Sequence, residues 1–154
     1  MQTTSQSSNP AFAAALQLFQ AQARLEERFA DGLGVIHGLS LKDTLLLMHV
    51  ARAEEGRLSR IDLARRLSVS PSTVTRTAAP LEKRGLLGRE SNKHDARYAY
   101  VVLTKAGRQA IADAQATFER ISAAVFSDRW TRQEISSLAS LLGRLTAGQP
   151  GIAG

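Results

Sequence analysis

The chain has 154 residues, of which 44% are hydrophobic and 22% charged, and its formal net charge is +6, so it is long enough for one domain with a hydrophobic core. It has no cysteine, which excludes a disulfide framework, a thiolate metal site and a cysteine-based redox switch. No segment approaches the ~20 apolar residues of a membrane span and the first nine residues lack an apolar signal core, so we expect a soluble, cytoplasmic protein.

The N-terminal part predicts a helix with more apolar surface than it can bury alone. Residues 1–9 and 148–154 are polar or glycine-rich, and we expect both to be disordered tails. The first helix is expected from Pro10 to about Asp31, where Gly32 and Gly34 end it. Its apolar residues form two stripes about 100° apart: Phe12, Leu16, Phe19 and Ala23, and then Leu18, Leu25 and Phe29. Because the core needs only one stripe, we assign residues 10–39 to dimerisation.

A second helix is predicted from Ser40, which would cap it together with Asp43, to about Glu55. Its run Leu45-Leu46-Leu47-Met48 makes it apolar on nearly every side. We therefore expect it to be central and buried. Gly56-Arg57-Leu58 ends it, with room for a very short strand.

A helix-turn-helix motif is predicted from Ser59 onward. Ser59 and Asp62 have the capping-box pattern at the start of a short helix. After a three-residue turn, Ser70 is placed to cap a second helix that begins at Pro71.

The second helix of this motif has one apolar and one polar face. Its inward residues follow i, i+4, i+7 spacing: Val74, Ala78 and Leu81. The other face carries Ser72, Thr73 and Arg76, whose donors and acceptors suit base edges and phosphates in a major groove. Pro80 removes a backbone hydrogen bond and predicts a kink.

Two strand-like runs follow, from Gly88 to Ser91 and from Tyr98 to Leu103. The second run is β-branched and aromatic, and the polar, basic connection between them predicts a hairpin. A basic hairpin after a helix-turn-helix indicates a wing. We place the winged helix-turn-helix domain at residues 40–108.

Two further helices are predicted, one from Thr104 to about Ser127 and one that begins with a capping box of Thr131 and Glu134. Their apolar residues recur every three or four positions, as in coiled-coil seams: Ile111, Ala114, Phe118, Ile121, Val125, and then Ile135, Leu138, Leu142 and Leu145. Together with the first helix, these two helices present more apolar surface than one small domain needs for its core. We therefore predict a homodimer and assign residues 109–147 to dimerisation.

Positive charge is concentrated between Arg57 and Arg108. This third of the chain has twelve Lys and Arg residues against four acids, whereas the rest has eight against ten. Such a local excess is the electrostatic footprint of a surface that binds a polyanion.

The motifs of this stretch resemble the MarR family of bacterial winged-helix transcription regulators. They are Leu63-Ala64-x-x-Leu67-x-Val69-Ser70, Leu81-Glu82-x-x-Gly85-Leu86-Leu87 and, in the wing, Asp95-x-Arg97 followed by Leu103-Thr104-x-x-Gly107. In helix order the match covers roughly residues 10–147. The resemblance implies a mainly α fold with a small β wing, in which N- and C-terminal dimerisation helices flank the winged helix-turn-helix.

The resemblance also implies how DNA is bound. Arg97 would enter the minor groove, oriented by Asp95, which agrees with the attraction of arginine to a narrow minor groove. The residues expected to bind DNA are Ser70, Ser72, Thr73, Thr75, Arg76, Lys93, Asp95 and Arg97. Our first hypothesis is therefore a dimeric, sequence-specific, nucleoid-associated repressor that reads a pseudo-palindrome with half-sites about one helical turn apart.

Family members commonly respond to small, often aromatic or phenolic anions. By analogy, such an effector would bind near His37, Met48, His49 and Arg52. The histidines, His37, His49 and His94, are widely spaced without a metal-ligand pattern, so we expect no metal and no cofactor.

Other classes of function are less well supported by the residues. We see no Ser/His/Asp order, phosphate-cradling glycine loop or paired catalytic carboxylates, so we do not expect an enzyme. One alternative is a nonspecific nucleoid-architectural DNA-binding protein, against which the polar face at Ser72, Thr73 and Arg76 argues. Another is a winged-helix module that binds protein, against which the local charge excess argues.

Overall fold

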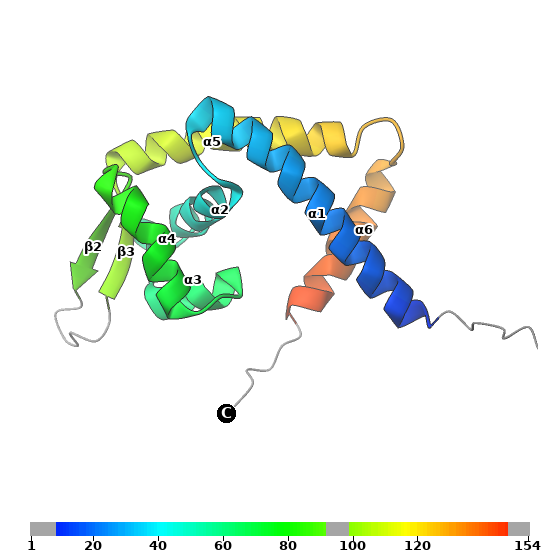
Figure 1. The fold of residues 1–154 in the computed structure, drawn as a ribbon, viewed down its shortest axis with the longest axis horizontal. Coiled ribbons are helices and arrows are strands. Elements are labelled where there is room, and N and C mark those ends of the chain that lie inside the picture. The colour runs from blue at the N-terminus through cyan, green and yellow to red at the C-terminus, as the bar shows by residue number, and fades with distance from the viewer. Residues whose placement is uncertain (1–8, 92–98, 148–154) are drawn as a thin grey trace, which may run out of the picture. The chain divides into compact units, whose positions relative to one another are not determined.

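The computed structural model describes residues 9–91 and 99–147 (Figure 1). Over these residues the chain is mainly helical with one small antiparallel sheet, which confirms the predicted fold class. The elements are α1 (Pro10–His37), α2 (Leu41–Ala51), the 3-10 turn η1 (Glu54–Gly56), β1 (Arg57–Ser59), α3 (Arg60–Leu67), α4 (Pro71–Lys83), β2 (Leu87–Ser91), β3 (Ala99–Leu103), α5 (Lys105–Val125) and α6 (Arg132–Ala147). The disorder expected for residues 1–9 and 148–154 concerns residues outside this description, except at Asn9, where it is wrong: the Asn9 side chain caps α1 by accepting from the Ala11 N–H at 3.0 Å. Residues 1–118 and residues 119–154 form two compact units.

The predicted starts of the helices in the helix-turn-helix region are confirmed by capping hydrogen bonds. The Ser40 hydroxyl accepts from the Asp43 backbone N–H, and the Asp43 carboxylate accepts from the Ser40 N–H, both at 3.0 Å. The hydroxyls of Ser59 and Ser70 likewise accept the N–H three residues further on. Each such cap contributes about 1 kcal/mol to helix stability.

The predicted end of the first helix is wrong. α1 passes through Gly32 and Gly34 and continues to His37, where Gly38 adopts a left-handed φ of 61°. Leu33 in this last part is fully buried. Burial of a leucine contributes about 1.5 to 3 kcal/mol, which offsets most or all of the roughly 1 kcal/mol that each glycine costs in a helix.

The second helix, in contrast, is shorter than predicted. α2 ends at Ala51, and Glu55 takes a left-handed φ of 57° in the turn that follows. The chain then enters β1, which confirms the predicted very short strand. α2 is buried on most sides as expected: Thr44, Leu46, Leu47, Met48 and Val50.

The core of residues 1–118 is organised around α2. This helix contacts α1, α3, α4 and strands β1 and β3. The largest fully buried side chains come from these helices, from β3 and, at Leu39, from the connection between α1 and α2: Leu33, Leu39, Thr44, Leu46, Leu47, Val50, Leu63, Val74, Leu81 and Val101. α1 also meets α5, where the rings of Phe29 and Phe118 lie 4.3 Å apart between centroids.

The sheet confirms the predicted hairpin over its described residues. Its strand order is β1-β3-β2, and both pairings are antiparallel. β2 and β3 pair from Leu87 opposite Leu103 to Ser91 opposite Ala99. The hairpin therefore extends from the buried end at Leu103 toward residues 92–98.

The motif Leu103-Thr104-x-x-Gly107 fixes the start of α5. The Thr104 hydroxyl lies 2.6 Å from the Gly85 carbonyl oxygen and accepts from the Gly107 N–H at 2.9 Å. A Cβ on Gly107 would collide with the Leu86 carbonyl oxygen and lie 2.9 Å from Leu103 Cδ1. Only glycine therefore allows the first turn of α5 to pack against this backbone.

The second unit is less buried over its described residues, 119–147. The predicted capping box is present, since Glu134 Oε2 accepts from the Thr131 N–H at 2.7 Å and the Thr131 hydroxyl accepts from the Glu134 N–H at 3.2 Å. The Thr131 backbone N–H and the Thr131 hydroxyl both donate to the Glu134 carboxylate, and these two bonds hold the pKa of Glu134 below its usual range. No residue of α6 is buried, and three of its leucines are exposed: Leu142 and Leu145, which belong to the predicted seam, and Leu141, which does not.

Candidate nucleic-acid interface

The outward face of α4 carries the polar residues that the sequence assigned to DNA. Ser70 caps the helix, and its hydroxyl lies 2.9 Å from the hydroxyls of both Ser72 and Thr73. The inward positions of α4 are at most 2% exposed: Val74, Ala78 and Leu81. Because the apolar face is fixed in the core, the hydroxyl groups at the start of the helix are held toward solvent.

Arg76 extends this polar face by one turn. Its Nη2 donates to the Thr73 hydroxyl at 3.4 Å, and its side chain is exposed. The helix continues past Pro80 to Lys83, so the arginine lies in the first half of a single helix. A guanidinium in this position can form two parallel hydrogen bonds with a guanine edge or with a phosphate.

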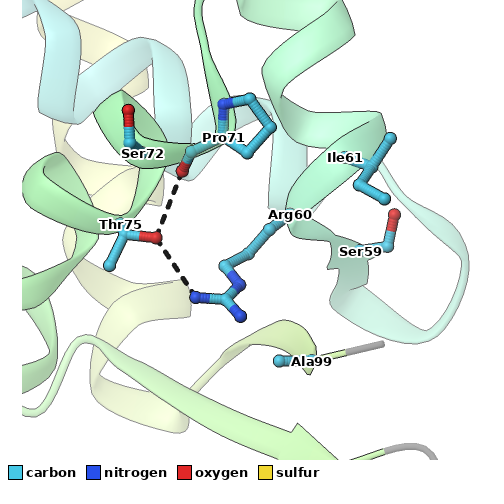
Figure 2. Close-up of a pocket in the computed structure, with 7 residues that line it drawn as sticks. All are labelled: Ser59, Arg60, Ile61, Pro71, Ser72, Thr75 and Ala99. Atoms are coloured by element: carbon cyan, nitrogen blue, oxygen red, sulfur yellow. Dashed lines mark hydrogen bonds between the residues drawn. The ribbon is translucent and has the colours of Figure 1, made fainter. Parts of the chain in front are cut away.

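Thr75 differs from its neighbours because it faces α3. Its hydroxyl donates to the Pro71 carbonyl at 3.1 Å and accepts from Arg60 Nη1 at 3.2 Å. Figure 2 shows the Arg60 side chain reaching from α3 toward α4 above the start of β3. These groups line a hollow of about 270 Å³, whose lining residues are Ser59, Arg60, Ile61, Pro71, Ser72, Thr75 and Ala99.

Sequence reasoning missed Arg60. Its contact with Thr75 spans fifteen positions and crosses the turn between two helices, so no local periodicity indicates it. The only available signal was the concentration of basic residues in this third of the chain.

The base of the wing is tied to α4 and to β1 by ion pairs. Arg89 on β2 donates through Nε to both carboxylate oxygens of Glu82, at 2.8 and 2.9 Å, and Glu82 raises the pKa of Arg89. Arg57 lies 2.8 Å from Glu55 and 3.5 Å from Glu90, and its guanidinium carbon lies 5.4 Å from the centre of the Tyr100 ring. The predicted wing contacts Lys93, Asp95 and Arg97, and also His94, lie outside the described residues.

Much of the positive charge in this region is not neutralised by neighbouring acids. Within residues 9–91 and 99–147, ion pairs engage Arg57, Arg65 and Arg89, whereas Arg60 and Arg76 have no carboxylate within 4.0 Å. Unpaired guanidinium groups on α3 and α4 leave a positive potential beside the polar face of α4. This arrangement favours contact with a polyanion.

The four residues predicted to bind an effector do not share one environment. His37 Nε2 lies 2.8 Å from the Thr117 hydroxyl, which joins the end of α1 to α5. Met48 is buried on α2. His49 is half-buried, and its burial, followed by the charges of Arg66 and Arg52, lowers its pKa below 6.5.

Neither the hollow beside Arg60 nor a second one near Tyr100 includes any of these four residues. In the described parts of the chain, no group of three or more His, Asp or Glu side chains is placed to hold a metal ion. Of the helices described, none has the length and apolar character required to cross a membrane.

Comparison with known proteins found a family model that matches part of this chain. The model of the MarR family matches residues 37–97, which span the helix-turn-helix and the first part of the wing. No curated protein matches the sequence.

Several solved structures share the fold over nearly the whole chain. Sco3205 from Streptomyces coelicolor, a MarR family transcriptional regulator solved in complex with DNA, superposes with a TM-score of 0.85 at 24% identity, covering 96% of this chain and 93% of its own. A probable transcriptional regulator from Pseudomonas aeruginosa gives a TM-score of 0.75 at 27% identity, and the match covers 85% of this chain and 95% of that protein. Bordetella bronchiseptica BpsR, whose DNA binding is regulated by 6-hydroxynicotinic acid, gives a TM-score of 0.77 at 21% identity. This match covers 88% of this chain and 94% of BpsR.

Proposed function

The chain carries the MarR-family match over its helix-turn-helix and the fold of MarR-family transcriptional regulators, and from this premise we propose that it acts as a homodimeric repressor. Two copies bind one pseudo-palindromic operator, and the exposed face of α4 in each copy reads one half-site in the major groove. The wing contacts the adjacent minor groove. A small aromatic or phenolic anion releases the complex.

The exposed polar face of α4 is the observation that supports sequence-specific binding most directly. Its apolar face is fully buried, while the hydroxyl of Ser72 and the guanidinium of Arg76 remain exposed. Hydroxyl groups and arginine side chains recognise base edges as well as phosphates. A binder that used charge alone would not require this ordered face.

The proposal of a homodimer is supported by apolar surface that the single chain leaves exposed. On α1, Phe12 and Phe19 are about 70% exposed. On α6, considered by itself, three leucines are exposed as well: Leu141, Leu142 and Leu145. Exposed apolar groups at helical spacing favour a protein partner, and a symmetric operator requires two copies.

The proposal of an effector is supported by analogy with BpsR and by one local feature. His49 is half-buried on α2 and lies in the electrostatic field of two arginines, Arg52 and Arg66. Such surroundings favour a small anion. The ligand would release DNA by binding more tightly to an arrangement of the dimer that does not fit the operator.

Selection of bound sequences from a randomised duplex pool tests the proposed function. We expect enrichment of a two-fold symmetric motif with half-sites about 10 base pairs apart. Binding without an enriched motif would favour the architectural alternative. Failure to bind any duplex would contradict our proposal, and the remaining alternative would be a winged-helix module that binds protein.

Replacing Arg76 tests base reading by α4. We expect Arg76→Ala to lower affinity for the selected operator by about 10- to 100-fold, or roughly 1 to 3 kcal/mol, and to relax the preference at one base pair in each half-site. Lys83→Ala, at the exposed end of the same helix, serves as the matched control for loss of charge. An unchanged preference in Arg76→Ala would contradict the assigned role.

A further inference from the structure

We infer that Arg60 binds a backbone phosphate of the DNA duplex and that Thr75 positions its guanidinium for this contact. The inference rests on the proposed function and extends it to a residue on α3 that no motif indicated. It also gives Thr75 a positioning role in place of the direct DNA contact expected from the sequence.

The geometry around Thr75 fixes the orientation of its hydroxyl. The single hydroxyl proton goes to the Pro71 carbonyl at 3.1 Å, so the oxygen presents lone pairs toward Arg60 Nη1 at 3.2 Å. A guanidinium has five N–H donors, and this bond uses one of them. The other donors of Arg60 remain available while the side chain is held in place.

The charge of Arg60 has no partner among the described residues. The nearest acid in sequence, Asp62, is engaged elsewhere: its Oδ2 accepts from the Ser59 hydroxyl at 2.6 Å, and its Oδ1 accepts from Arg65 Nη1 at 3.4 Å. Arg65 on the same helix is therefore paired, whereas Arg60 has no ion-pair partner within residues 9–91 and 99–147. If Arg60 served only to link α3 to α4, a neutral donor would serve equally well.

The hollow beside Arg60 opens on the side of the molecule that faces DNA in our proposal. One of its walls is Ser72, which also lies on the exposed face of α4. Figure 2 shows the guanidinium between Thr75 and Ala99, with space beside it. The volume of about 270 Å³ is sufficient for a phosphate group. A duplex that contacts Ser72 would thus bring a backbone phosphate within reach of Arg60.

Salt-dependent binding of Arg60→Gln to the selected operator tests the inference. Each lost phosphate contact lowers the slope of log affinity against log salt by about 0.9, so we expect a decrease of about 1.8 for a dimer, with affinity at least about tenfold weaker for every sequence tested. Arg65→Gln, which removes an ion-paired charge from the same helix, should change the slope much less. Equal changes in slope for the two variants would overturn the inference.

Arg60→Lys separates a phosphate contact from a purely structural link. Lysine keeps the charge but not the forked geometry, so we expect most of the salt slope to be retained even if thermal stability falls. If both variants lose thermal stability but Arg60→Gln keeps the wild-type salt slope, Arg60 only joins the two helices. That result would overturn the inference.

Thr75 is tested by a rescue and a double mutant. We expect Thr75→Val to weaken binding about threefold for all sequences and Thr75→Ser to restore it, because serine keeps the hydroxyl. In an Arg60→Gln background, Thr75→Val should add little, since both changes remove one coupled contact. An altered base preference in Thr75→Val, or additive losses, would contradict its positioning role.

These results are distinguishable from failure of the proposed function. If wild-type protein selects no operator and binds no duplex, the proposed function fails. If wild-type protein binds its operator and Arg60→Gln binds equally well with the same salt slope, only the role of Arg60 fails.

Discussion

Helices α4 and α6 have similar lengths but differ in what they expose: α4 exposes only its polar face, whereas α6 also exposes its apolar face. α4 buries its apolar residues within the chain and exposes its polar ones, among them Ser72 and Arg76. α6 buries none of its residues, and Leu141, Leu142 and Leu145 are 36 to 60% exposed. Amphipathic periodicity alone therefore does not indicate a helix's role. The role follows from the chemistry of the face that stays exposed in the single chain. A polar, basic face suits DNA, and an apolar face suits another protein surface.

The largest effect should come from disrupting the core packing near α4, and it should appear in the free energy of unfolding. Gly107→Ala places a methyl group against the Leu86 carbonyl and Leu103, so we expect the free energy of unfolding to fall by about 3 kcal/mol. Urea denaturation measures this loss. Gly34→Ala is the control, because its Cβ would meet no atom within 4 Å and alanine favours a helix by up to about 1 kcal/mol. Similar losses in both variants would contradict the packing described for Gly107.

The next largest effect should come from the exposed face of α6. We expect Leu142→Asp to raise the dimer dissociation constant about 30-fold, or roughly 2 kcal/mol, because it places a charge in an apolar contact. Sedimentation at several protein concentrations measures this shift. Ser140→Asp adds the same charge at an exposed polar position of the same helix and should leave dimerisation unchanged. If Leu142→Asp also leaves it unchanged, this part of α6 does not join the two copies.

The smallest effect concerns pH. Burial and the nearby Arg66 and Arg52 lower the pKa of His49 below 6.5 in the folded chain. The unfolded chain therefore binds the proton more readily, and stability falls as the pH drops through about 6.5 toward the folded-state pKa. We expect His49→Gln to lose less stability than wild type between about pH 7.5 and pH 5.5 in thermal unfolding. Identical pH profiles would show that His49 is not responsible for any such loss.

Local signals in the sequence were sufficient for most of the secondary structure. Ser40, Ser59 and Ser70 begin helices because a hydroxyl can accept an otherwise unpaired backbone N–H, which is a property of a few neighbouring residues. The inward face of α4 followed from i, i+4, i+7 spacing. The motif glycine Gly107 was identified by resemblance, and its physical reason became clear only from the nearby Leu86 carbonyl.

Features that depend on tertiary contacts could not be predicted in this way. The first helix continues beyond Gly32 and Gly34 because Leu33 is buried against other elements, and burial overrides helix propensity. In the same way, Arg60 meets Thr75 across a turn, and His37 meets Thr117 from eighty positions away. Neither pairing has a sequence period that would reveal it, so the environments of predicted site residues emerged only with the fold.

The most direct test of the central claim is the dependence of DNA binding on the spacing between half-sites. With the selected operator, sedimentation and titration should show two chains bound to one duplex, and inserting about five base pairs, half a helical turn, should weaken binding by about 100-fold or more. This result would mean that one face recognises DNA while another joins two copies in a fixed register. Binding of single chains with equal affinity at every spacing would contradict the account.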